Sequence, residues 1–429
     1  MKILAVDVGT GTQDILLFDT DKEIENCFKL VMPSPTVLVA REIRKATAQG
    51  QNILLTGTIM GGGPCTWAVS DHLKAGYQVY ATPLAAQTFD DDLENVEHMG
   101  VRLVEDDVSS LSGSQVRSDD FSRPGKSATE VATTSQSRDR VIQVRSDDFS
   151  RPGKNATEVA TTSQIRDQMS LNGVRRVEMK DFYFDAIRDA FHAFGVELEV
   201  DALALAVFDH GAAPPGYSDR RFRFDYLEER LRAQNGLAGF AFWRAEIPDR
   251  FTRLQAVASS APPDLSVMVM DTGPAAVLGA LEDRRVRAQD PVLIANVGNF
   301  HCLAFHVAGG EVVGVFEHHT GELTREELVT YLRKLADGSL TNQEVFDDMG
   351  HGALVFKQTN QTPDLFTIVG PRRGLLRESA LPIYQAVPHG DMMLVGCFGL
   401  IRAYAQKDAA HGDEIAAVLD GTAEASSPW

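Results

Sequence analysis

The fold is decided by residues 292–307, VLIANVGNFHCLAFHV, together with residues 3–19, ILAVDVGTGTQDILLFD, which repeat the same plan. Each stretch is an apolar run, a turn with glycine two residues after Asp7 or Asn296, and a second apolar run. This pattern predicts a β-hairpin whose turn directs backbone N–H groups and small hydroxyls at one place, which suits phosphate. Two such hairpins far apart in the chain predict two similarly built lobes that close on one nucleotide.

Composition and charge exclude several classes of partner. The chain has 429 residues, of which 44% are hydrophobic and 24% charged, as expected for a soluble protein with two or more domains. Its net charge of -19 argues against nucleic acid or an anionic membrane surface. No apolar run has the length of a membrane span, and the N-terminus enters a strand without a signal-peptide pattern. Because its four cysteines lie far apart, we expect free thiols and a cytoplasmic protein.

Alternating strands and helices predict an α/β fold of two lobes with an insertion in the first. Two capping boxes mark helix starts, Thr324 with Glu327 and Thr341 with Glu344. Residues 275–281, AAVLGAL, are mostly small and predict a helix that packs closely against another. The expected parts are lobe I in residues 1–107 and 169–281, the insertion in residues 108–168, lobe II in residues 282–390, and a C-terminal helix with a polar, frayed tail in residues 391–429.

The insertion contains a repeat. Residues 115–136, QVRSDDFSRPGKSATEVATTSQ, recur as residues 143–164 with Ser127 replaced by Asn155. Two copies are too few for a solenoid, and large apolar residues are too few for a core. We expect a disordered or loosely ordered surface segment; the functional alternative is a tethering or recognition arm.

Five motifs, taken in order, resemble those of the actin, Hsp70 and sugar-kinase superfamily of ATPases. They are a first phosphate motif at residues 5–12, a strand at 203–209, a first connecting helix at 271–279, a second phosphate motif at 294–299 and an adenosine motif at 368–374. The whole chain is also similar to a prokaryotic branch sometimes labelled pyruvate formate-lyase activating proteins. The resemblance implies two ribonuclease H-like lobes with a nucleotide cleft between them, and ATP with Mg²⁺ as ligands.

The label of that branch implies radical chemistry, which the cysteines do not support. An activating enzyme of this kind holds an iron–sulfur cluster with three closely spaced cysteines, CxxxCxxC. No two cysteines of this chain lie within such a spacing. Direct radical chemistry is therefore not expected.

The resemblance assigns roles to the first phosphate motif. Asp7 is expected to hold Mg²⁺ through water, since magnesium prefers a few carboxylates and phosphate oxygens; the alternative is an aspartate that stabilises its own turn. Gly9 and Gly11 would let the backbone approach phosphate, and Thr10 and Thr12 would add hydroxyl donors.

The second phosphate motif departs from the family pattern. Asn296, followed by Gly298 and Asn299, stands where the family has aspartate. An amide can bind phosphate or a metal-bound water, but it cannot act as a base. Slow hydrolysis is the expected consequence.

The adenosine motif departs as well, since Pro371 replaces a second glycine. Gly370 and Arg372 are its candidate nucleotide contacts. Arg372 or Arg373 can stack on adenine or contact phosphate; the alternative is a solvated surface arginine.

Two aspartates are candidate catalytic residues. Asp271 ends a buried strand and starts the connecting helix, where the matching residue of similar sugar kinases takes the proton from the acceptor hydroxyl. The alternative is an N-cap for that helix. Asp209, which follows the apolar strand over residues 203–208, is the second candidate.

Histidines gather near the ends of these motifs, and as a group they can build a metal site or bind an acidic substrate. None has a recognised ligand spacing, so each is alternatively a hydrogen-bonding loop residue. They are His210, His318, His319, His351 and His389. Cys65, after three glycines, is a candidate for a lowered pKa, and core packing is the alternative.

Three functions remain open. The first is an ATPase or phosphotransferase acting on an unidentified small molecule, with Asp271 as base. The second is a nucleotide-driven switch that binds or activates a partner protein, such as a glycyl-radical enzyme. The third is a nucleotide-binding protein without turnover.

Overall fold

The computed structural model describes residues 1–105, 173–357 and 362–423. Contacts divide the chain into one unit of Met1–Ser109 with Val174–Trp429 and another of Ser110–Gly173. The predicted disordered insertion and its repeat lie outside the described residues. Within them the chain is a mixed α/β protein, as predicted, with three separate sheets.

The first sheet has six strands in the order β3-β2-β1-β8-β10-β9. Three strands form an antiparallel meander, β8 and β10 follow in parallel on the β1 side, and β9 is antiparallel at the edge. Because β1 and β8 are buried along nearly their whole length, their sequences KILAVDV and ALALAV are almost continuously apolar. The strands are β1 (Lys2–Val8), β2 (Thr12–Asp19), β3 (Phe28–Pro33), β8 (Ala202–Val207), β9 (Ala241–Trp243) and β10 (Ser266–Asp271).

The second sheet repeats this plan in the order β14-β13-β12-β11-β15-β16. An antiparallel meander of β11, β12 and β13 is again extended by parallel strands on the side of its first strand. The two hairpins identified in the sequence are therefore β1–β2 and β11–β12. The strands are β11 (Val292–Val297), β12 (His301–Ala308), β13 (Glu311–His319), β14 (Gly352–Val355), β15 (Phe366–Val369) and β16 (Ile383–Gln385).

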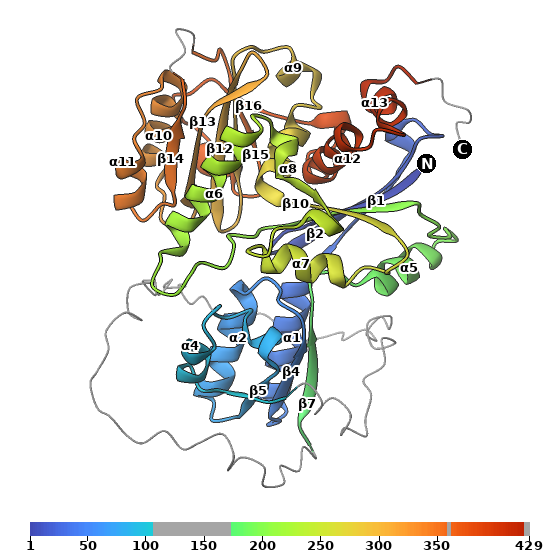
Figure 1. Ribbon diagram of the computed structural model, residues 1–429, viewed down its shortest axis with the longest axis vertical. Helices are drawn as coiled ribbons and strands as arrows, with labels where there is room; N and C mark the ends of the chain where they lie inside the picture. The colour runs from blue at the N-terminus through green and yellow to red at the C-terminus, as the bar shows by residue number, and fades with distance from the viewer. Residues whose placement is uncertain (106–172, 358–361, 424–429) are drawn as a thin grey trace, which may run out of the picture. The chain divides into compact units, whose positions relative to one another are not determined.

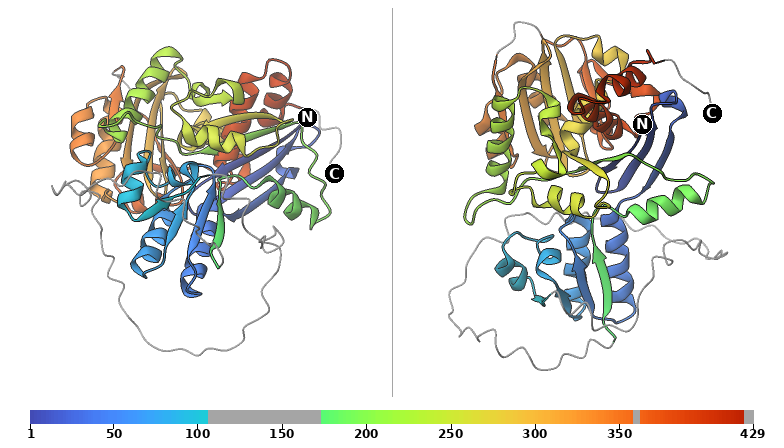
Figure 2. Two further views of the ribbon diagram at one scale, coloured as in Figure 1. Left: turned by 60° about the horizontal axis from the view of Figure 1, so that its bottom comes forward. Right: turned by 45° about the vertical axis from the view of Figure 1, so that its right-hand side comes forward.

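A third sheet, which the sequence analysis did not separate from lobe I, is parallel and has the order β6-β5-β4-β7. Its last strand comes from beyond the insertion, so that β7 (green) lies beside the blue β4 (Figures 1 and 2). A separate core cluster forms around it. The strands are β4 (Ile53–Gly57), β5 (Val79–Ala81), β6 (Val101–Leu103) and β7 (Arg175–Met179).

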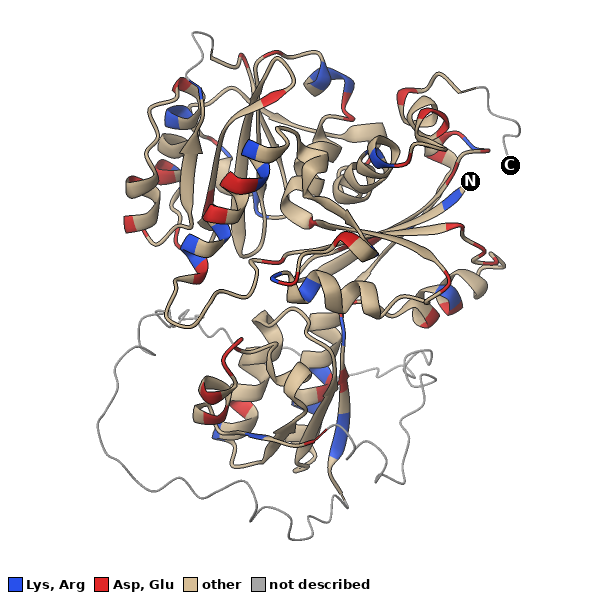
Figure 3. Ribbon diagram, viewed as in Figure 1, with Lys and Arg blue, Asp and Glu red and all other residues tan. Residues whose placement is uncertain are grey.

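Helices cover the sheets and carry many of the charged residues, with others in the connecting loops, whereas the strands of the six-stranded sheets are mainly uncharged (Figure 3). Both predicted capping boxes are present, at α10 and α11. The helices are α1 (Pro35–Ala48), α2 (Gly63–Lys74), α3 (Pro83–Ala86), α4 (Leu93–His98), α5 (Phe184–His192), α6 (Asp219–Ala233), α7 (Thr252–Ser259), α8 (Thr272–Ala280), α9 (Arg284–Arg287), α10 (Arg325–Asp337), α11 (Asn342–Asp347), α12 (Val395–Lys407) and α13 (Gly412–Asp420).

Helices α8 and α12 pack unusually closely, as the small residues of α8 predicted (Figure 1). A methyl group on Gly279 would overlap the carbonyl oxygen of Val395, and one on Gly399 would overlap that of Ala275. Helix α8 also contacts strands of both six-stranded sheets. The largest hydrophobic core therefore runs through this crossing and includes residues of both sheets.

The prediction of a frayed C-terminus is wrong for the residues that can be described. Helix α13 buries Ile415, Val418 and Leu419, whose spacing of three and four places them on one face. Asp420 at its end accepts a hydrogen bond from Arg402 of α12 at 2.6 Å. Among the described helices, none combines the length and apolar character needed to cross a bilayer.

Candidate functional site

The two glycine turns have the same internal geometry. The N–H of Gly9 donates to the Thr12 carbonyl at 2.9 Å, and the N–H of Gly298 donates to the His301 carbonyl at 2.9 Å. A Cβ atom would lie 3.1 Å from the acceptor oxygen at Gly9 and 2.7 Å from it at Gly298. The turns thus require small residues at these positions, for the same steric reason.

The tips of the two turns adjoin. A Cβ on Gly11 would lie 3.5 Å from the side-chain nitrogen of Asn299, and both residues are exposed. At Gly63, where α2 begins, a Cβ would lie 3.2 Å from the Phe300 ring and 3.6 Å from the Thr10 methyl group. The first turn of α2 therefore stands beside both hairpins.

The adenosine motif lies directly on the second hairpin. A Cβ on Gly370 would lie 2.5 Å from Oδ1 of Asn296, and φ at Gly370 is +96°, a conformation that favours glycine. Arg372 is exposed, whereas Arg373 donates to the Gly370 carbonyl at 2.9 Å. The structure thus brings Gly370 and Asn296 together, while Arg372 faces solvent.

Asp7, the predicted metal residue, is buried where α8 and α12 begin. Its Oδ1 accepts a hydrogen bond of 2.6 Å from the Thr272 hydroxyl, the first residue of α8. A Cβ on Gly396 would overlap its Oδ2, so α12 approaches the carboxyl without a side chain between. Burial raises the pKa of Asp7 to about 6, against the lowering effect of the Thr272 hydrogen bond.

Asp14 is the cross-strand neighbour of Asp7 on β2. Its Oδ1 is buried without a hydrogen-bond partner. Burial, followed by repulsion from Asp7 and Asp391, raises its pKa to about 8. Asp14 was not predicted as a site residue, although its place opposite Asp7, directly before the apolar residues 15–18, was an available signal.

These carboxyls predict that the protein loses stability as pH rises from about 4 to 8. The unfolded chain ionises Asp14 near its ordinary pKa of 3.8, whereas the folded state holds the proton up to about 8. Each pH unit within that window therefore costs up to about 1.4 kcal/mol of unfolding free energy. Asp14→Asn should flatten this dependence in urea titrations at pH 6 and 8, whereas the exposed Asp185→Asn should leave it unchanged. An unaltered slope in Asp14→Asn would refute the assignment.

The two catalytic candidates are both held by hydrogen bonds. Asp271 caps α8, accepting from the Gly273 N–H at 2.9 Å, and its Oδ2 accepts from Arg223 at 2.7 Å. The alternative reading as an N-cap is thus confirmed. Burial raises the pKa of Asp271 more than Arg223 lowers it. Asp209 accepts from the N–H groups of Gly211 and Leu254, both at 2.8 Å, which is a structural role.

Arg223 of α6 joins the two six-stranded sheets through buried ion pairs. It is fully buried and donates to Asp271 at the end of β10 and, at 3.1 Å, to Glu317 Oε2 of β13. It also donates to the Asp209 carbonyl at 3.1 Å and lies over the Phe208 ring. Burial would lower its pKa, but the two carboxylates raise it.

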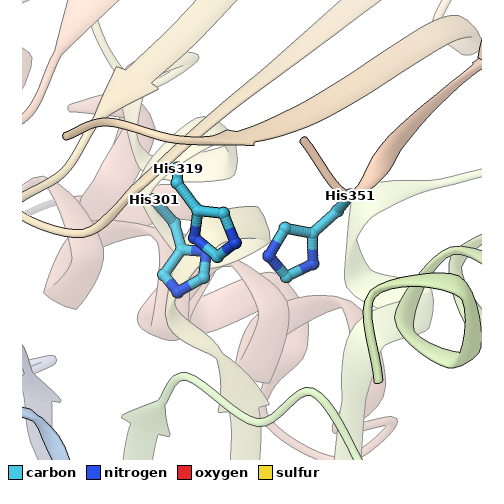
Figure 4. Close-up of side chains that lie close together, drawn as sticks. All are labelled: His301, His319 and His351. Atoms are coloured by element: carbon cyan, nitrogen blue, oxygen red, sulfur yellow. The ribbon is translucent and has the colours of Figure 1, made fainter. Parts of the chain in front are cut away.

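Three histidines gather beside this ion pair: His301, His319 and His351. Their potential ligand atoms all lie within 4.8 Å of one another, and Figure 4 shows the three rings close together. His301 and His319 are cross-strand partners on β12 and β13. Burial, with neighbouring histidines, lowers the pKa of His319 to about 4 and that of His351 well below 6.5.

The predicted histidine group is only partly brought together. His318 is buried on the other side of β13, with Nε2 3.4 Å from Asp348, while His210 is exposed and His389 packs against Phe398. His301 was missed, although it alternates with the apolar residues of β12 just after the second turn.

Cys65 is a core residue, as the alternative reading held. It is fully buried, and burial raises the pKa of its thiol to about 12. A reactive thiolate at the start of α2 is therefore ruled out.

Fold and site together define a mixed α/β protein with two matched glycine hairpins beside buried carboxylates and a histidine cluster. Residues 60–149 and 153–375 match the family described as "Putative pyruvate format-lyase activating enzyme (DUF1786)", and the chain belongs to that family. The similarity to proteins carrying this label is thereby confirmed. A comparison with curated proteins gave no match.

The cysteines do not fit the iron–sulfur cluster that this family description implies. All four are buried, and they lie far apart in the sequence. The thiol of Cys397 donates to the Asp14 carbonyl and that of Cys65 to the Thr36 carbonyl. In the described part of the chain no cysteine belongs to a group of potential metal ligands. We therefore derive no radical chemistry from the family description.

Proposed function

We propose that the protein binds ATP with Mg²⁺ between two ribonuclease H-like lobes and acts as an ATPase or phosphotransferase of the actin, Hsp70 and sugar-kinase type. The observation that carries the proposal is the pair of matched turns whose tips adjoin at Gly11 and Asn299. Each turn follows the first strand of a sheet, and both sheets have the same plan of a meander extended by parallel strands. Backbone turns of this kind suit phosphate.

The close crossing of α8 and α12 supports the same proposal. The first residue of α8, Thr272, fixes Asp7, and α12 begins against the same carboxyl. A movement of either helix is thereby coupled to the position of Asp7. In a two-lobed ATPase this is where opening and closing of the lobes would be linked to the nucleotide.

The residues around Asp7 fit a magnesium ion. Asp7 and Asp14 are cross-strand neighbours, and the buried Oδ1 of Asp14 lacks a partner, as expected for a group that binds a cation directly or through water. When bound, Mg²⁺ would neutralise charge on the phosphate groups. Gly11 and Asn299 would position the phosphates, and Gly370 would leave room for the nucleoside beside Asn296.

A second function, the nucleotide-dependent activator of a partner protein, is favoured by the state of Asp271. Both of its carboxylate oxygens are engaged, by Gly273 and by Arg223, so it can accept a proton only after release from the arginine. Asn296 at the second phosphate motif also favours the activator, because an amide cannot act as a base. Slow turnover suits a switch better than a metabolic kinase.

Calorimetric titration with ATP, with and without Mg²⁺, tests the nucleotide site. We expect binding that requires Mg²⁺, and a loss of roughly tenfold or more in affinity for Asp7→Ala and Gly11→Ala, because a bridging carboxylate or close backbone approach is lost. Gly236→Ala is the matched control, since a methyl group there meets open space. Failure of the unaltered protein to bind ATP, or equal binding by Asp7→Ala, would refute the proposal.

Turnover separates the two functions. A hydroxyl compound that accelerates ATP consumption in the unaltered protein, but not in Asp271→Asn, selects the phosphotransferase. Nucleotide-dependent association with one partner, with no such acceleration, selects the activator.

A further inference from the structure

We propose that His301, His319 and His351 bind one divalent transition-metal ion, with Zn²⁺ as the best-suited ion and Glu317 as the carboxylate that orients the ligands. The site is distinct from the Asp7 magnesium position and does not rest on the proposed nucleotide function. Three imidazoles with a carboxylate behind them suit zinc and similar ions rather than magnesium, which prefers oxygen ligands.

Geometry brings the three rings within reach of one ion. Their candidate ligand atoms lie within 4.8 Å of one another, and their ring centroids are 4.6 to 5.1 Å apart. A tetrahedral ion with bonds of about 2.0–2.1 Å holds its ligands roughly 3.4 Å apart. Rotation of the rings about their side-chain bonds would reduce that difference, and Figure 4 shows the three rings close together.

The hydrogen bonds of the cluster are incomplete in a way that a cation would explain. Both ring nitrogens of His351, which is 3% exposed, are buried without a hydrogen-bond partner, as is Nδ1 of His301. Buried polar groups are ordinarily paired. The two Nδ1 atoms face Glu317, which leaves Nε2 of His351 as the buried, unpaired nitrogen that a cation would engage.

Glu317 supplies the second layer of such a site. Its Oε1 lies 3.3 Å from Nδ1 of His301 and 3.7 Å from Nδ1 of His351, without a hydrogen bond formed, while Oε2 is held by Arg223. A carboxylate behind metal-binding histidines fixes ring orientation and raises ligand basicity. It also leaves the Nε2 atoms of both rings free for the ion.

The backbone around the site is built to hold these rings. The N–H of His351 donates to the Glu317 carbonyl at 2.9 Å. Its neighbours are glycines: a Cβ on Gly350 would overlap His318, and Gly352 has φ +146°. The Phe208 ring stacks on His301 with centroids 4.1 Å apart. His301 and His319 remain half-exposed, which leaves one side of the ion open to water or a substrate.

Zinc titration of chelator-treated, full-length protein tests this site without nucleotide. We expect one Zn²⁺ per chain and a tetrahedral Co²⁺ absorption spectrum on substitution. His319→Ala should weaken binding by roughly 100-fold or more, since a ligand is lost, and Glu317→Gln by about 10- to 100-fold. His210→Ala, at an exposed position two residues from Phe208, should bind as the unaltered protein does. Excess Mg²⁺ should not displace the ion.

Two results would overturn the proposal: substoichiometric zinc in the unaltered protein, or equal affinity in folded His319→Ala. If His319→Ala does not fold, His301→Asn, whose side chain lies at the edge of the cluster, replaces it. Gly11→Ala should retain zinc, so that failure of the nucleotide site and failure of the metal site are told apart.

Discussion

Arg223→Met is expected to lower the free energy of unfolding by about 3–5 kcal/mol, the usual effect of removing one partner of a buried ion pair. The substitution leaves the buried carboxylates of Asp271 and Glu317 without their shared cation. It also removes the link from α6 to the ends of β10 and β13. Methionine fills much of the same space, so the loss is electrostatic rather than a cavity.

The dependence of this loss on pH identifies its cause. Glu317 has a lowered pKa because Arg223, with His351, outweighs the raising effect of burial. A lowered folded pKa contributes stability above the ordinary value of 4.5 and loses it as pH falls. The difference between Arg223→Met and the unaltered protein should therefore be larger at pH 7 than at pH 4.

Guanidinium denaturation at the two pH values measures this difference. Arg232→Met, on the same helix but 65% exposed and paired with Glu228 at the surface, is the control and should change stability by less than about 1 kcal/mol. Equal effects of the two substitutions, or a loss independent of pH, would contradict a buried ion pair that joins the sheets.

The hairpins were predictable because their signal is local. Each hairpin is specified within twenty residues. The apolar runs predict the two strands, and the polar residue with a glycine two positions later predicts the turn between them. The capping boxes at Thr324 and Thr341 are local in the same sense. Close packing of α8 followed from its small residues Ala275, Ala276 and Gly279, even though the partner helix could not be named from α8 alone.

The histidine cluster and its ion pair depend on contacts between distant segments. His351 reaches His301 only because β14 pairs with β13, and nothing in the sequence near Gly350 specifies that pairing. Without knowledge of that pairing, His318 was as good a candidate as His319. Because the two are adjacent on β13, their side chains point to opposite faces of the sheet. His318 packs against Tyr331, whereas His319 packs against His301.

Arg223 was missed because it lies in a helix rich in arginine, where charged side chains are usually exposed to solvent. Its position does carry a signal. Arg223, Leu227 and Leu231 are spaced by four residues, and all three are buried. A charged residue on the apolar face of a helix indicates a buried partner, but it does not say that the partner is Glu317.

The second large effect is expected at the helix crossing, where Gly399→Ala should destabilise the protein by about 3 kcal/mol. Replacing glycine by alanine ordinarily stabilises a helix by about 1 kcal/mol, so the destabilisation expected here is opposite to the usual effect. The reason is steric: the new methyl group would overlap the Ala275 carbonyl and lie 2.8 Å from the Gly279 nitrogen. Both are backbone atoms, which cannot rotate away, so α8 and α12 must separate.

Separation of these helices should also reach the proposed nucleotide site. Thr272 begins α8 and holds Asp7 by its hydroxyl, so a displaced α8 loosens that hydrogen bond. Gly399→Ala should therefore weaken Mg-ATP binding as well as stability, whereas zinc binding at β12, β13 and β14 should persist in the folded fraction. Gly236→Ala, where a methyl group meets open space, is the control for both measurements. Stability should be measured by denaturant unfolding. Unchanged stability in Gly399→Ala would mean that α8 and α12 can adjust to the new methyl group. That result would also refute the proposed coupling between α12 and Asp7.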